Sequence, residues 1–272
     1  MRKMQRYDFV AYNSINEMVQ HLSSIQGDPF SELYSNGHDE EWYGTKSFQD
    51  AVERVTKGDK ELSKLVRGSE KLDVKIPATG TRRKMITGVC GFMPHVPNYL
   101  AGVPNNMIFC KEQKIAKKVI TVVYGTNMRH DIDVDEVAAV SARVLSCIMS
   151  LERKGYRVNL YAASVASYTG DENPKKSTGF ITKLKDSGQH LDLIKMAFPM
   201  LSASWNRRFG FRFREMCRWS SMGYSIYGKE LRQFLTNHKV QYDVALGFYD
   251  ARELRTVEQL EKLFLESTNK IK

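Results

Sequence analysis

The segment from residue 118 to residue 164 constrains the fold more than any other part of the chain. It opens with KVITVVY, a run of β-branched residues typical of a strand buried on both faces. A helix is predicted over residues 134–154, with Asp133 as its N-cap and Gly155 at its end. RVNLYAAS follows as a second strand. Strand, helix and strand together predict a parallel βαβ unit.

The rest of the C-terminal half extends this unit into an open sheet. GDENPKKSTG reads as a charged hairpin loop, and FITKLKD as a strand suited to a sheet edge. Helices, the strand YDVALGF and a final helix over residues 257–267 complete the pattern. The sequence therefore predicts a three-layer α/β sandwich with an open sheet over residues 118–272.

The first 117 residues show a different pattern. Residues 1–67 read as a small, mainly helical module, with one strand (YDFVAY) and with Ser14 and Ser47 as helix caps. Residues 68–117 read as an irregular connector, because GVCGFMPHVPNYLAGVPNN has three prolines and three glycines.

Composition and missing motifs exclude several classes of protein. No stretch contains the 18 or more apolar residues of a membrane helix, and the start has no leader-like apolar region, so a soluble intracellular protein without membrane contact is expected. The four cysteines form no CxxC pair, which predicts free thiols. No GxGxxG, GxxxxGK[ST] or GxSxG motif occurs at the strand ends, so no cofactor is expected.

Positive charge gathers in the second part of the chain. The net charge is +1 over residues 1–100 and +9 over residues 101–272, which favours acidic partners for the latter. Residues 204–219, SWNRRFGFRFREMCRW, hold five arginines and five aromatic residues. A helical projection at 100° per residue places the apolar side chains on one face, namely Trp205, Phe209, Phe213 and Met216.

The opposite face of that helix is predicted to expose Arg207, Arg214 and Arg218. Arginines along a helix pair with phosphates, and an aromatic ring among them stacks on a base. The predicted nucleic-acid-binding residues are Arg207, Arg208, Phe211, Arg212, Arg214, Arg218, Lys175 and Lys176. An acidic protein surface as partner, and a merely solvated basic face, remain as alternatives.

A second candidate site lies where the parallel strands end. Ligands of open α/β sheets bind in the crevice at the carboxyl ends of the strands. The predicted crevice residues are Gly125, Thr126 and Asn127 after the first strand and Ser164 and Ser167 after the second. Their hydroxyl and amide groups suit a partner side chain or a small ligand.

This order of elements resembles von Willebrand factor A-like domains, over roughly residues 118–268. Such domains carry D-x-S-x-S after the first strand, where carboxylate and hydroxyl oxygens hold a divalent ion. The matching stretch here is YGTNM, which lacks the motif, so no metal site is expected. The nearest carboxylates are Asp131 and Asp133.

Over the whole chain, WYGTKSFQDAVERVTKG, VPNYLAGVPNNMI, LERKGYRVNL and the segment from AFPML to RRFGFRF resemble an uncharacterised family of tailed-phage proteins. The resemblance implies a phage-encoded protein of the host cytoplasm or the virion, with no known chemistry to transfer.

The sequence thus favours a non-enzymatic protein that binds nucleic acid through its basic helical face. The alternative is a protein-interaction module, either a virion assembly component or an inhibitor of a host factor, that uses the crevice. A third hypothesis, a metal-dependent hydrolase, requires His38, Glu40, Asp131 and Asp133 to converge in one pocket.

Overall fold

The computed structural model describes residues 8–24, 34–66, 80–115, 118–168, 176–217, 224–225 and 227–269. Contacts divide the chain into a large unit of residues 1–75 and 119–272 and a small unit of residues 76–118. The N-terminal residues thus share one unit with the α/β part of the chain, whereas the sequence suggests a separate module over residues 1–67.

The large unit is built on a mostly parallel sheet with the strand order β1-β7-β6-β5-β9. β5 is parallel to β6 and to β9, and β6 is antiparallel to β7. β1 pairs in parallel with the outer side of β7, so the prediction that FITKLKD forms a sheet edge is wrong. The short β8 pairs with β6. The strands are β1 (Phe9–Tyr12), β5 (Val119–Gly125), β6 (Arg157–Tyr168), β7 (Lys176–Lys185), β8 (Tyr224–Ser225) and β9 (Val244–Gly247).

Helices surround this sheet. Several begin where the sequence places a cap: Ser14 Oγ accepts a hydrogen bond from Glu17 N, and the Asp133 side chain accepts one from Asp135 N. The helices are α1 (Ile15–Ser23), α3 (Glu40–Tyr43), α4 (Phe48–Lys57), α5 (Lys60–Lys64), α7 (Val134–Arg153), α8 (Leu193–Leu201), the π-helix η2 (Trp205–Gly210), α9 (Phe211–Met216), α10 (Gly228–Asn237), α11 (Phe248–Glu253) and α12 (Val257–Asn269).

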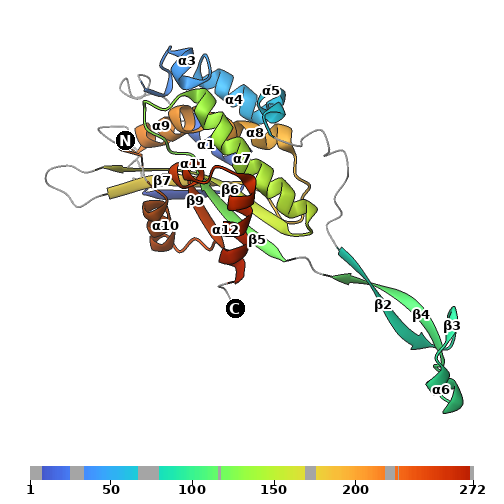
Figure 1. The fold of residues 1–272 in the computed structure, drawn as a ribbon. Helices are drawn as coiled ribbons and strands as arrows, with labels where there is room; N and C mark the ends of the chain where they lie inside the picture. The colour runs from blue at the N-terminus through green and yellow to red at the C-terminus, as the bar shows by residue number, and fades with distance from the viewer. Residues whose placement is uncertain are drawn as a thin grey trace. The chain divides into compact units, whose positions relative to one another are not determined.

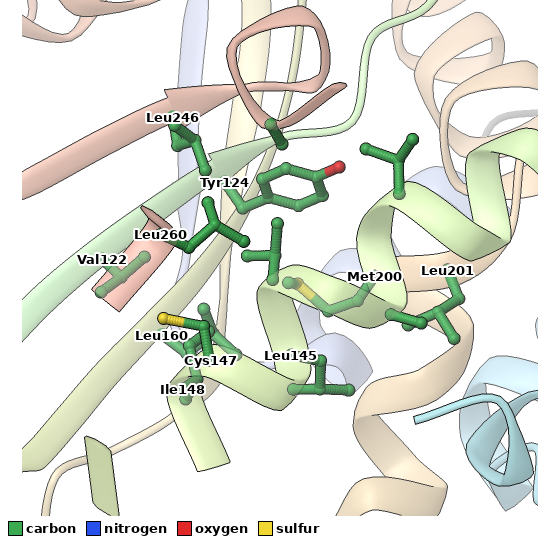
Figure 2. Close-up of a cluster of buried hydrophobic side chains, with 14 of the residues drawn as sticks. Val122, Tyr124, Leu145, Cys147, Ile148, Leu160, Met200, Leu201, Leu246 and Leu260 are labelled. Carbon is green, nitrogen blue, oxygen red and sulfur yellow. The ribbon is translucent and has the colours of Figure 1, made fainter. Parts of the chain in front are cut away.

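The β-branched strand β5 is buried on both faces, as its composition predicts. Val122 and Tyr124 point into a core filled by α7 and α8, where Leu145, Ile148 and Met200 pack (Figure 2). Successive side chains of a strand point to opposite faces of the sheet, so Val122 and Tyr124, two residues apart, share this core.

The opposite face of the sheet is covered by α10. Val123, Ala163 and Ile181 pack there against Leu231 and Phe234. α7 and α10 therefore lie on opposite sides of the sheet (Figure 1), and the three-layer α/β prediction is confirmed.

The small unit is a β-hairpin, where the sequence suggests an irregular connector. β2 (Gly80–Gly88) and β4 (Met107–Ile115) pair antiparallel along their whole length, and the short β3 (Met93–Pro94) adds to β4. The prolines and glycines that suggested irregularity lie between β2 and β4, around β3 and the short helix α6 (Val96–Leu100). The sequence correctly predicts turns at these prolines and glycines, but it does not predict the strands on either side of them.

Candidate functional site

A pocket of about 680 Å³ opens in the large unit where β5 and β9 end. Residues 126–130 follow β5 on one side, and Tyr249 follows β9 on the other. This is the position at which open α/β sheets bind ligands. We call it the arginine pocket, after the buried Arg207 and Arg214, which line it together with the exposed Arg129. Its other principal lining residues are Trp42, Asn127, Phe211 and Tyr227.

The structure brings part of the predicted crevice into this pocket. Asn127 lines it, and its Oδ1 accepts a 2.7 Å hydrogen bond from Val165 N in β6. Thr126 is buried and bonded to the Ala163 carbonyl, and Gly125 lies at the end of β5. Ser167 lies elsewhere, in a separate pocket beside α10. The sequence thus predicts one crevice, but in the structure its side chains lie on two faces of the sheet.

Asn206 connects the crevice to the arginine-rich stretch. Its Oδ1 accepts hydrogen bonds from Asn127 Nδ2 (3.2 Å), Ser164 Oγ (3.0 Å) and Arg214 Nη2 (3.1 Å). Asn206 lies in η2, and π-helices occur frequently at functional sites. Two candidate sites that the sequence suggests separately therefore meet at one amide oxygen.

Gly210 makes this close approach possible. A Cβ at this position would collide with Ser164 Oγ and would lie 2.7 Å from Asn206 Oδ1. The absence of a side chain lets the helical segment lie directly against the polar side chains at the strand ends.

The predicted exposure of the arginine face is wrong. Arg207 and Arg214 are each only 2% exposed, and Arg208 and Arg212 are buried as well. The aromatic face was assigned correctly, since Trp205, Phe209, Phe213 and Met216 are buried in one hydrophobic cluster. The opposite side of the helix is covered by residues 34–45 and 126–132, which the helical projection does not include.

Two of the arginines hold the fold together. Arg208 donates to the carbonyls of Ser35, Gly37 and Thr45, and its guanidinium stacks 3.7 Å from the centre of the Tyr43 ring. Arg212 lies near Glu215, whose carboxylate accepts a hydrogen bond from Ser35 N. These contacts join η2 and α9 to the N-terminal part of the chain.

The other two arginines line the pocket. Arg207 donates to the carbonyls of Trp42 and Ile132, and its guanidinium lies 4.3 Å from the centre of the Trp42 ring. Neither Arg207 nor Arg214 pairs with a carboxylate within the part of the chain that the structure describes. Burial lowers the pKa of Arg207 to about 10 and that of Arg214 to about 9, so both guanidinium groups are charged at neutral pH.

Aromatic side chains form much of the pocket lining. The rings of Trp42 and Phe211 lie 6.0 Å apart, and those of Tyr227 and Tyr249 lie 4.9 Å apart. Phe211 is half-buried, whereas the other aromatic side chains of residues 205–217 are buried. Trp42 is fixed by a 2.7 Å hydrogen bond from Nε1 to the His130 carbonyl.

The remaining predicted nucleic-acid-binding residues are Lys175, Lys176 and Arg218. Lys175 and Arg218 lie outside the described residues. Lys176 is the first residue of β7.

Two of the carboxylates considered for a metal have other partners, as does the neighbouring Asp39. Asp39 caps α3 by accepting from Trp42 N, Asp133 caps α7, and Asp131 pairs with Arg129. In the described ranges, no three His, Cys, Asp or Glu side chains lie close enough together to hold a metal ion. The convergence that the hydrolase hypothesis requires is therefore not seen there.

Sequence reasoning missed most of the pocket lining, including Asn206, Trp42, Tyr227 and Tyr249. Asn206 has a local signal, because it is a polar residue within a helical segment that is otherwise basic and aromatic. The three aromatic residues lie far from the stretch in sequence, and only the folded chain places them together.

The fold and the site define a three-layer α/β protein with a polar, aromatic-lined pocket at its strand ends. The chain belongs to the family described as Domain of unknown function (DUF7192), whose model matches residues 4–264. No curated protein and no solved structure matches the chain. Among the described residues, no helix is long and apolar enough to cross a membrane.

Proposed function

We propose that the protein is a non-enzymatic binding protein that takes single-stranded nucleic acid into the arginine pocket. The observation that carries this proposal is the pair Arg207 and Arg214, two charged guanidinium groups that line the pocket with no carboxylate partner among the described residues. A phosphate would supply the missing negative charge.

The aromatic lining supports a single strand over a duplex. Proteins that bind single strands combine cationic side chains for the phosphates with aromatic rings for the unpaired bases. The bases of a duplex are already paired and stacked on one another, so they are not free to stack on the rings of the pocket. The binding surface proposed here is thus a pocket, and not the exposed helical face that the sequence suggests.

The second candidate is a protein-interaction module, either in virion assembly or in inhibition of a host factor. Asn127, Ser164 and Arg214 all donate hydrogen bonds to Asn206 Oδ1. This cluster of polar groups favours the second candidate, because it also suits an acidic side chain of a partner protein. An acidic protein surface would then replace the nucleic acid.

We also propose that the large unit is von Willebrand factor A-like and that the protein comes from a tailed phage, acting in the host cytoplasm or the virion. The antiparallel pairing of β6 with β7 supports the first part, because the sequence predicts a hairpin at this place, although β1 rather than β7 forms the edge of the sheet. The second part rests on the sequence resemblance alone.

A salt titration of binding tests the proposal. Fluorescence anisotropy would compare a labelled single-stranded DNA or RNA with the matching duplex and with polyglutamate. The proposal expects tighter binding of the single strand, with log K falling against log salt by about 0.7 for each phosphate neutralised. Preference for polyglutamate would favour the protein-interaction module, and absence of all nucleic-acid binding at low salt would refute the proposal.

A further inference from the structure

Arg214 is a buried charge whose hydrogen bonds are incomplete. Its Nη2 donates to Asn206 Oδ1, but its Nε is buried and has no hydrogen-bond partner. The guanidinium also lies 5.0 Å from the centre of the Phe211 ring, which contributes attraction without supplying an acceptor. Glu215 attracts Arg214 electrostatically but forms no ion pair with it, and a buried charge without an ion-pair partner is costly, so the arrangement favours an anionic ligand in the pocket that Arg214 lines.

The surroundings of Arg214 fix its direction before any ligand arrives. Asn206 Oδ1 is itself held by Asn127 and Ser164, so the acceptor that orients Arg214 is anchored to two strand ends. Arg207 adds a second positive charge to the same pocket, and its hydrogen bonds to backbone carbonyls hold it in place. A preorganised cationic site of this kind suits a phosphate.

The pocket also offers a ring on which a planar group can stack. Tyr227 is 55% exposed, and its ring lies 4.9 Å from that of Tyr249 at an angle of 39°. One side of Tyr227 is thus supported by Tyr249 while much of the ring remains accessible. A pocket of about 680 Å³ lies within the range of about 300–1,000 Å³ found for small-molecule sites.

We propose that the arginine pocket binds one nucleotide, with its phosphate at Arg214 and its base stacked on Tyr227. This inference rests on the proposed function and deepens it, because it names the unit of nucleic acid that the pocket recognises. The same chemistry is present in a free mononucleotide and in one nucleotide of a strand, and the experiment separates the two sources.

The test uses isothermal titration of the full chain with AMP, adenosine and inorganic phosphate, and anisotropy with a labelled single-stranded oligonucleotide. Three variants are compared. Arg214→Met removes the charge at similar length, Tyr227→Ala removes an exposed ring, and Arg252→Gln is the control, since Arg252 is a partly exposed arginine outside the pocket. Circular dichroism and thermal unfolding confirm that each variant folds.

The inference expects AMP to bind more tightly than either adenosine or phosphate. Arg214→Met should weaken AMP at least tenfold and leave adenosine nearly unchanged. Tyr227→Ala should weaken AMP and adenosine alike, by about 5- to 100-fold, which is the usual range for loss of a base–aromatic stack. Arg252→Gln should bind AMP within about twofold of the natural protein, since exposed charges act weakly at a distance.

Equal binding of AMP and adenosine would overturn the inference, as would AMP binding that Tyr227→Ala leaves unchanged. Because Tyr227 is exposed, this second result decides the matter even if Arg214→Met fails to fold. If strands bind but AMP does not, the inference fails while the proposed function stands. If AMP binds but strands do not, the inference stands while the proposed function fails.

Discussion

Replacing Asn206 with aspartate should change stability and ligand binding in opposite directions. The substitution keeps the shape of the side chain and the oxygen that accepts from Arg214, Ser164 and Asn127. Among the described residues, the amide nitrogen that it removes donates only to Met128 Sδ, at 3.8 Å. Arg214 would thereby gain an internal counter-charge at hydrogen-bond distance.

The magnitude follows from the hydrogen bond between residue 206 and Arg214. The natural hydrogen bond already involves the charged Arg214 and contributes about 1.5–3 kcal/mol, and aspartate would add the attraction between two opposite charges. The three donors that surround the new carboxylate offset its loss of hydration, and we expect a net stabilisation of about 1 kcal/mol. For a chain of this size that corresponds to a rise in Tm of about 2–4 °C.

Thermal unfolding and AMP titration together measure both effects. In the Asn206→Asp variant, Arg214 would already be paired with the new carboxylate when an anionic ligand arrives. The affinity for AMP should therefore fall at least tenfold while Tm rises. Asn237→Asp, which adds the same charge at an exposed position in the last turn of α10, is the control. It should leave AMP affinity unchanged, and it should not raise Tm, because a negative charge at a helix C-terminus is unfavourable. A less stable Asn206→Asp protein, or one that binds AMP like the natural protein, would refute the reasoning.

Three further predictions concern stability. Burial raises the pKa of Glu215 above its usual value of 4.5. The protonated carboxyl group therefore stabilises the folded state at low pH, and this contribution is lost as the pH rises. In urea unfolding, the natural protein should become less stable relative to Glu215→Gln between about pH 4 and pH 7. Lys185 Nζ lies 2.6 Å from Glu152 Oε1 and both side chains are fully buried, so Lys185→Met should cost about 3–5 kcal/mol, and the Lys185→Met/Glu152→Leu pair should recover much of it. None of the buried hydrophobic residues of the described chain comes from residues 76–118, so replacing that unit with a Gly-Ser linker should leave the Tm of the rest nearly unchanged in calorimetry.

Local patterns were sufficient to predict the α/β core. The β-branched run of β5, the apolar spacing of α7 and the caps at Ser14 and Asp133 each depend on residues close in sequence. Such local patterns predict the structure correctly, because the periods of strands and helices determine which side chains face the core.

The candidate site was predicted only in pieces. The sequence indicated Asn127, Ser164 and the arginines, but it assigned them to a crevice and to a separate exposed face. Their meeting depends on contacts between residues more than 30 positions apart, such as Asn206 with Asn127. The prediction that the arginines are exposed is wrong for a related reason. Arg208, for example, is covered by Ser35, whose carbonyl accepts its hydrogen bond from 173 positions away in the sequence.

The π-helix η2 decides which way Asn206 faces. A π-helical turn bonds residue i to residue i+5, so it holds one residue more than the α-helical turn that would replace it. If the same number of residues formed an ordinary α-helix there, the extra residue would add about 100° of rotation between Asn206 and α9. In a relative of the same length that lacks the π-helical turn, Asn206 and Arg214 would no longer face each other, and we expect such a protein to lack the arginine pocket.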